Sequence, residues 1–171
     1  MALLRRDKGP GGTRYRMREK FFSIGDDSWI ETEDGQRAFK VNGKALRIRR
    51  TLIFESPSGE QLFKIQEKKL HIRDTMEIED DGQTVAKVHK ALITPLRERY
   101  VIELADGTEL NAKGNIVDHE YKIENGHTVA EVSKKWFRAR DTYGIEVAPG
   151  EDPVLILAIA VVLDSMAHEH R

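Results

Sequence analysis

Basic side chains recur in three short segments of the chain and could together bind phosphate. Alternate residues of an extended strand point to the same side, so the bases within each segment would share a face. Lysine and arginine on such a face can hold the phosphates of a lipid head group, and Trp136 and Phe137 are close enough in sequence to enter a membrane interface. The candidate anion-binding residues are Lys44, Arg47, Arg49, Lys68, Lys69, Arg73, Lys134, Lys135, Arg138 and Arg140.

The same bases could instead pair with acids on neighbouring strands. Acidic residues recur in phase with the basic ones, among them Glu55, Glu77 and Glu79, and the net charge is only -1. A cross-strand charge pair contributes about a few tenths of a kcal/mol. We favour this pairing, because the acids recur in phase with the bases and the net charge is near zero; if the basic strands lay side by side, they would instead form a cationic stripe on the barrel wall.

Other reactive side chains do not form a recognisable site in the sequence. The chain has no cysteine, no Gly-x-Ser-x-Gly, no His-Glu-x-x-His and no phosphate-binding loop. His168 and His170 lie two residues apart in a polar tail, and His119 takes a repeat position that is elsewhere filled by arginine, where a corner residue is expected. We therefore predict no enzyme, no cofactor and no metal site.

A repeat of about 24 residues organises the chain. Between the turns the sequence alternates with period two, which predicts strands with one buried face. Trp29 and Ile30 are one position out of step, which a β-bulge or a shifted turn would explain. The turn pairs, each expected to form a two-residue hairpin turn, are Asp34-Gly35, Ser58-Gly59, Asp81-Gly82, Asp106-Gly107 and Asn125-Gly126. The expected inward face comprises Leu52, Phe54, Met76, Ile78, Tyr100, Ile102, Tyr121, Ile123, Tyr143 and Ile145.

The apolar run at residues 154–163 predicts the architecture. Asp152 can cap a helix that starts at Pro153, and a helix that is apolar on every side must be buried. The run would span about 20 Å, less than the roughly 30 Å core of a bilayer. A sheet of about ten to twelve strands can close around it. We predict a mainly β protein, a closed antiparallel barrel around a helix at about residues 153–166; a further buried strand is the alternative for this run.

The order of several short segments resembles the LURP-one-related family of the tubby-like superfamily, which also includes phospholipid scramblases. The segments are FFSIGDDSWIETEDGQRAFKVNGKALRIR, IRDTMEIE, ALITPLRERY and the final apolar run. The resemblance implies a barrel of about twelve strands with the C-terminal helix threaded through it. Tubby domains bind phosphoinositide head groups through basic residues, and scramblases are linked to lipid movement and calcium, but no binding residue of either transfers to a position here.

We expect residues 1–13 to be a flexible lead-in and residues 14–171 to form one domain. With 28 Lys and Arg against 29 Asp and Glu, nothing indicates nucleic-acid binding. The expected function is a non-catalytic, soluble module that binds anionic phospholipid head groups and lies in the cytoplasm or peripherally at the membrane. The alternatives are a scaffold or regulator that binds another protein and, more remotely, a scramblase-like protein anchored by residues 154–163.

Overall fold

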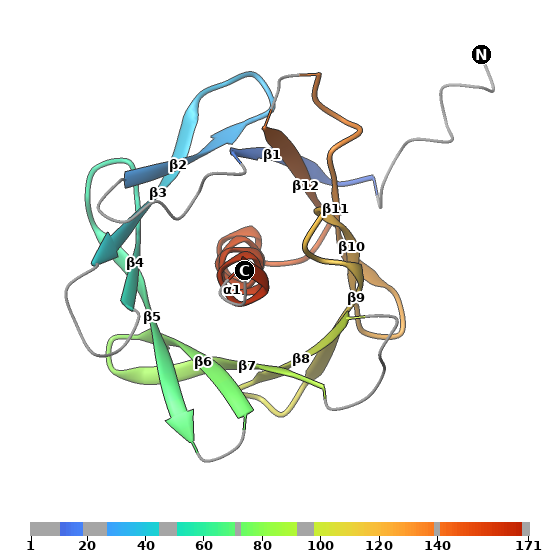
Figure 1. Ribbon diagram of the computed structural model, residues 1–171. Coiled ribbons are helices and arrows are strands. Elements are labelled where there is room, and N and C mark those ends of the chain that lie inside the picture. The colour runs from blue at the N-terminus through green and yellow to red at the C-terminus, as the bar shows by residue number, and fades with distance from the viewer. Residues whose placement is uncertain are drawn as a thin grey trace.

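Twelve antiparallel strands form a closed barrel around one C-terminal helix in the computed structural model (Figure 1). The structure describes residues 11–18, 27–44, 51–70, 73–91, 98–138 and 141–168. Sequential strands are neighbours, and β1 closes the barrel by pairing with β12. The strands are β1 (Thr13–Arg18), β2 (Asp27–Thr32), β3 (Arg37–Lys44), β4 (Thr51–Glu55), β5 (Gln61–Leu70), β6 (Arg73–Asp80), β7 (Gln83–Lys90), β8 (Glu98–Leu104), β9 (Glu109–Asn115), β10 (Glu120–Glu124), β11 (Thr128–Ser133) and β12 (Thr142–Val147).

The helix α1 (Pro153–His168) runs through the barrel, as the sequence predicts. Asp152 caps it, since its Oδ1 accepts a hydrogen bond from the backbone N–H of Val154 at 3.0 Å. Every residue from Ile156 to Ala167 is buried. The apolar run that the remote alternative would place in lipid is therefore covered by the strands of its own chain.

The inward faces of the strands supply the rest of the core. All ten residues predicted for the inward face are buried, and most of them have almost no solvent exposure. Ile30 points inward with 0% exposure, whereas Trp29 lies outside beneath the Arg37 guanidinium, 4.3 Å from its ring centroid. A register shift between Ile30 and Glu31 confirms the β-bulge. Similar shifts occur at Phe54/Glu55, Ile78/Glu79 and Ile123/Glu124.

The glycine turns lie where the sequence places them, but most are longer than predicted. Only Asp81-Gly82 is a two-residue turn, with φ of 48° and 78° between the paired residues Asp80 and Gln83. The prediction of two-residue loops is wrong for the other four, because a register shift or an extra hydrogen-bonded residue lengthens the connection. In the loop after β2, for example, the Gly35 N–H donates to the Thr32 carbonyl at 2.9 Å.

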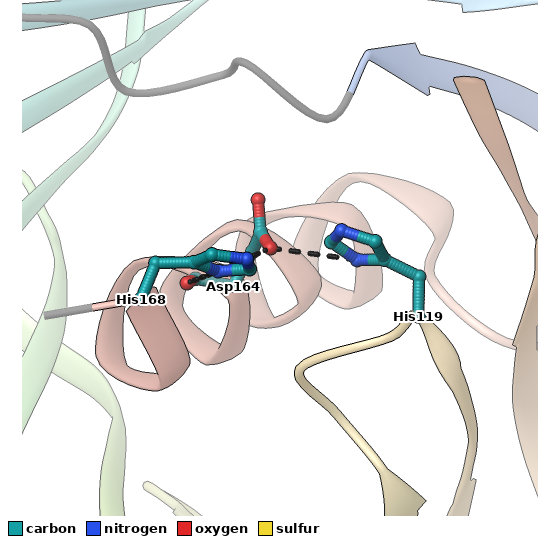
Figure 2. A group of neighbouring side chains, drawn as sticks. All are labelled: His119, Asp164 and His168. Atoms are coloured by element: carbon teal, nitrogen blue, oxygen red, sulfur yellow. Dashed lines mark hydrogen bonds and ion pairs between the residues drawn. The ribbon is translucent and has the colours of Figure 1, made fainter. Parts of the chain in front are cut away.

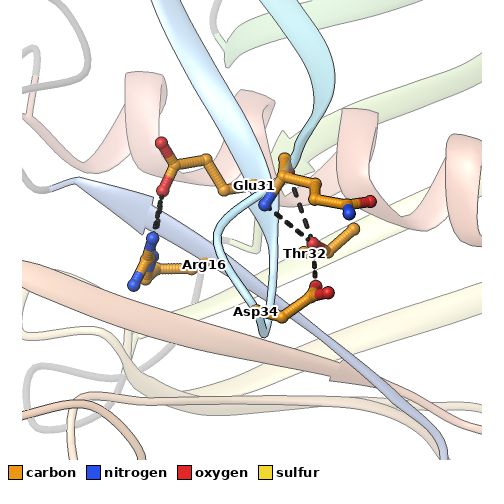
Figure 3. Close-up of polar contacts among 5 residues, drawn as sticks. Arg16, Glu31, Thr32 and Asp34 are labelled. Carbon is orange, nitrogen blue, oxygen red and sulfur yellow. Dashed lines mark hydrogen bonds and ion pairs between the residues drawn. The ribbon is translucent and has the colours of Figure 1, made fainter.

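Side chains brace that same loop and tie β2 to β1 (Figure 3). The Thr32 hydroxyl donates to Asp34 Oδ1 and accepts a hydrogen bond from the Gln36 N–H at 3.0 Å. Beside it, the Arg16 guanidinium meets Glu31 Oε2 at 2.6 Å. The short pairing between β1 and β2, which involves two residue pairs, is thereby reinforced by a charged contact.

The two ends of the barrel differ in construction. We call one end the turn rim; it consists of residues 33–36, 56–60, 81–82, 105–108, 125–127 and 148–152, and α1 begins there. We call the other end the loop rim; the strands that reach it last are β1, β3, β5, β7, β9 and β11, and α1 ends there at His168. Because every strand pair is antiparallel, alternate connections of the chain fall at the same rim.

Two aromatic rings cover the outside of β12. A Cβ atom built on Gly144 would lie 2.6 Å from Phe137 Cε2 and 2.8 Å from Trp136 Cε3, so both rings rest directly on this glycine. Arg14 and Arg16 of β1 stack over the rings, at 4.7 Å from the Trp136 centroid and 5.9 Å from the Phe137 centroid. This cover explains why Gly144, on the outer face of β12, is buried along with the residues of this strand that face the core.

Replacing Leu163 with alanine tests the packing of the helix. Leu163 has 0% exposure, so Leu163→Ala should lower the free energy of unfolding by about 2–5 kcal/mol. Leu155→Ala is the matched control, because Leu155 is only partly buried in the first turn of the same helix, and we expect less than about half that loss. Urea unfolding of both variants measures the difference; equal losses would contradict the central role of the buried helix.

Adding a methyl group at Gly144 tests the aromatic cover. Gly144→Ala should displace Trp136 and Phe137, costing about 1–3 kcal/mol and shifting the tryptophan fluorescence. The control is Gly43→Ala in β3, where the nearest atom to the added carbon is Leu52 Cδ2 at an ordinary 3.8 Å. That control should leave stability unchanged or raise it slightly. Unaltered fluorescence in the Gly144 variant would show that the rings do not rest on β12.

Candidate functional site

The candidate bases that the structure describes lie at the loop rim, on two separate arcs. Lys44 ends β3, Lys68 and Lys69 lie near the end of β5, and Arg73 begins β6. Lys134, Lys135 and Arg138 follow β11. Arg47, Arg49 and Arg140 lie outside the described residues. Because β1 and β2 stand between β12 and β3, the three basic segments do not lie side by side and do not form one stripe on the barrel wall.

Several bases on the barrel wall are paired with acids of neighbouring strands. Lys68 Nζ lies 3.9 Å from Glu77 and 3.6 Å from Glu79, and Lys87 approaches Glu77 from the other side at 3.9 Å. Lys113 meets Glu124 at 3.9 Å in the same manner. For Lys68 the predicted cross-strand pairing is therefore observed. Each of these partly exposed pairs contributes little to stability, but together they neutralise the wall.

Trp136 and Phe137 are engaged by the barrel rather than projecting from it. Both rings are half-buried on Gly144 beneath the guanidinium groups of Arg14 and Arg16. A ring held between a strand and a cation would have to break these contacts before it entered a membrane interface. The expected role of these two rings at a lipid surface finds no support in this geometry.

Charge is separated between the two rims. The connections of the turn rim, all of which the structure describes, contain no lysine or arginine. Their acids are Glu33, Asp34, Glu60, Asp81, Asp106, Glu151 and Asp152. At the loop rim, by contrast, Lys134, Lys135 and Arg138 occur together in the connection after β11, where Lys135 and Arg138 are exposed. The barrel therefore has an acidic end and an end that carries most of the candidate bases.

A buried polar cluster lies at the same end of the barrel as these bases, where α1 ends (Figure 2). Asp164, on the last turns of the helix, is 2% exposed, and its Oδ2 accepts a hydrogen bond from the Tyr143 hydroxyl at 3.3 Å. Two imidazoles approach the other carboxylate oxygen: Nδ1 of His119 lies 3.4 Å and Nδ1 of His168 lies 3.1 Å from Oδ1. These three residues could hold a metal ion, because one ligand atom from each lies within 4.8 Å of the others.

Local geometry brings these side chains together. His168 follows Asp164 by one helical turn, and its Nδ1 lies 2.8 Å from the Asp164 carbonyl oxygen. His119 occupies the corner between β9 and β10 with a φ of 56°, and its ring stacks on Tyr143 with centroids 3.9 Å apart. The ring of His168 also stacks near that of His119, with centroids 5.5 Å apart and ring planes 19° from parallel. The cluster is therefore held by the helix, by a strand corner and by β12.

The environment of the cluster is strongly desolvated. Burial, and secondarily the negative charge of Asp164, raise the pKa of Tyr121 well above its usual value. An ionised carboxylate among apolar side chains is costly unless it has partners. Asp164 thus concentrates negative charge at a point where the helix C-terminus already contributes a partial negative charge.

Sequence reasoning missed this cluster. It correctly treated His119 as a corner residue, and the corner turns its side chain inward, where it is 1% exposed. His168 was expected in a polar tail, yet it is the last residue of α1. The signal that could have revealed the cluster is Asp164 itself, a charged residue one turn before a histidine on a helix that must be buried.

Within the described ranges, no helix is both long enough and apolar enough to cross a membrane. α1, the helix that the sequence singled out for this question, has 16 residues.

Comparisons with known proteins agree with this architecture. The chain is 32% identical over 153 residues to the uncharacterized protein YxjI of Bacillus subtilis (strain 168), covering 89% of this chain and 92% of the relative. The X-ray structure of a protein from Arabidopsis thaliana superposes with a TM-score of 0.65 at 15% identity, covering 92% of this chain and 93% of the other, which supports the fold alone. A family model described as LURP-one-related matches residues 13–164, from the start of β1 into the last turns of α1. The chain therefore belongs to the LURP-one-related family.

Proposed function

We propose that this protein is a non-catalytic module that docks with its loop rim on anionic phospholipid surfaces. The observation that carries the proposal is the separation of charge between the acidic turn rim and the loop rim, where the candidate bases gather. A negatively charged leaflet attracts each nearby lysine or arginine by about 1 kcal/mol and repels the acidic end. The separation of charge therefore favours one orientation of the barrel on such a surface.

The shape of the rim supports docking by the end of the barrel rather than by its wall. The two basic arcs, one along β3 to β6 and one after β11, lie on different sides of the barrel but at the same end. A flat surface that meets this end can contact both arcs at once, whereas a surface along the wall would meet one arc and several neutral charge pairs. Docking through the rim thus replaces the stripe on the wall that the sequence suggested.

Charge reversal at the rim tests the proposal. In sedimentation with vesicles of phosphatidylcholine plus phosphatidylserine or phosphatidylinositol bisphosphate, the full chain should bind at low salt and dissociate as salt rises. Lys135 and Arg138 are both exposed in the connection after β11. Losing the attraction of two bases, about 1 kcal/mol each, should make the double variant Lys135→Glu/Arg138→Glu bind about 30-fold more weakly.

The matched control moves the same charge change to the wall. Lys87→Glu/Lys122→Glu alters the net charge equally in the middle of β7 and β10, and it should retain most of the affinity. An equal loss of vesicle affinity in both double variants would indicate a general effect of net charge and contradict docking through the rim. No binding to any anionic vesicle at low salt would overturn the proposal and favour the alternative, a scaffold or regulator that binds another protein.

A further inference from the structure

We infer that His119, Asp164 and His168 form a binding site for a divalent transition-metal ion, with Zn²⁺ the ion that best suits the ligands. This goes beyond docking on lipid and does not depend on it. It also departs from the sequence-based expectation of no metal site, because the three residues meet only in the folded chain.

The first support is an unsatisfied oxygen. Asp164 Oδ1 is buried and accepts no hydrogen bond from the residues that the structure describes. The other oxygen of the same carboxylate, Oδ2, accepts a hydrogen bond from the Tyr143 hydroxyl. Buried polar atoms without a partner are rare in folded proteins, and each one calls for a bound ion, a water or a functional reason. Oδ1 is also the atom that both imidazoles approach.

The two distances from the imidazoles to the carboxylate are close to those between ligands of a common ion. Zn²⁺ binds nitrogen and oxygen ligands at about 2.0–2.2 Å, so two ligands of a tetrahedral ion are separated by roughly 3.3–3.5 Å. The 3.4 Å between His119 Nδ1 and Asp164 Oδ1 falls in this range, and the 3.1 Å from His168 is slightly shorter. A direct hydrogen bond would have a separation of about 2.7–3.2 Å, which includes the distance from His168 but not the longer one from His119. Modest rotation of the side chains would admit the ion.

The types of ligand select the class of metal. Two imidazoles and one carboxylate suit Zn²⁺ and other first-row transition metals, whereas Ca²⁺ and Mg²⁺ prefer oxygen ligands throughout. Coordination through His168 Nδ1 requires the neutral ring to carry its proton on Nε2, so the metal bond would replace the hydrogen bond that Nδ1 can donate to the Asp164 carbonyl at 2.8 Å. The positive charge of the ion offsets both the buried carboxylate and the partial negative charge of the helix C-terminus.

Rigidity and access also fit a metal site. His119 is held by stacking on Tyr143, and Tyr143 in turn holds Asp164. The His168 side chain is 32% exposed, so an ion can reach the cluster from the loop rim. An ion bound there would fasten the end of α1 to the corner between β9 and β10. It would act as a structural lock on the helix within the barrel.

Metal binding by the full-length chain tests the inference. After treatment with a chelator, titration with Zn²⁺ in a calorimeter should show one ion per chain, and Zn²⁺ at about 100 times its dissociation constant should raise the melting temperature by roughly 5–10 °C. Co²⁺ in the same site should give the visible absorption bands of a tetrahedral ion. Asp164→Asn and His119→Gln should each weaken Zn²⁺ binding by about 100-fold or more.

Two histidine variants serve as controls. His127→Gln removes a histidine near the turn rim, 3.3 Å from Glu151 and far from the cluster, and it should retain full affinity. His170→Gln tests chelation by the tail, where His170 lies outside the described residues. Binding that survives Asp164→Asn and His119→Gln but is lost with His170→Gln would overturn the inference, as would the absence of Zn²⁺ binding by the full chain.

His168→Gln tests the ligand set even if the variants at the buried residues Asp164 and His119 fail to fold. His168→Gln changes only a partly exposed side chain at the end of α1, so it should keep the native fold. Circular dichroism and urea unfolding without metal verify this, and the same variant should lose the stabilisation by Zn²⁺. Full stabilisation of a folded His168→Gln chain by Zn²⁺ would contradict the proposed ligand set.

Discussion

The burial of one apolar helix is the constraint on which this structure depends. Each fully buried Leu, Ile, Val or Met side chain contributes about 1.5–3 kcal/mol relative to exposure, and α1 presents such side chains in every direction. A two-layer arrangement would cover one side of the helix only. A closed barrel of twelve strands covers all sides, and in return the helix fills an interior that strand side chains alone would leave partly empty. Helix and barrel therefore stabilise one another.

Polar groups at the end of the helix complicate this arrangement. The apolar surface is interrupted by Asp164 and Ser165, both almost fully buried, just before α1 reaches the loop rim. A chain selected only for a stable core would gain from apolar residues there, because a buried carboxylate is costly to desolvate. The convergence of two histidines and a tyrosine on Asp164 indicates that this position serves more than packing.

Charge on the outside follows the construction of the barrel. Along the wall, acids and bases alternate between neighbouring strands and cancel, as in the contacts of Lys68 and Lys87 with Glu77. At the ends cancellation is less complete: the glycine turns recruit Asp and Glu, with Arg14 of β1 lying 3.8 Å from Glu33, whereas the described connection after β11 at the opposite rim carries Lys and Arg. This difference in charge between the two ends makes the barrel electrostatically polar along its axis, whereas a uniformly paired surface would not be.

The sequence by itself determined the local elements: the inward faces of the strands, the positions of the turns, the bulge beside Ile30 and the helix capped by Asp152. These follow from backbone geometry and from the periods of two and 3.6 residues, which are readable along the chain. The position of the basic segments at one rim could also have been predicted from the sequence, because alternate connections of antiparallel strands share an end. The alternation of side chains along each strand instead suggested a stripe on the wall. Only the tertiary structure decided the register in which β1 pairs with β12 to close the predicted barrel, the cover of β12 by Trp136 and Phe137, and the meeting of His119 with Asp164 and His168. The pairing of β1 with β12 and the approach of His119 to Asp164 join residues far apart in sequence. All of these contacts depend on the tilt of the strands and the depth of the helix in the barrel, which no local pattern encodes.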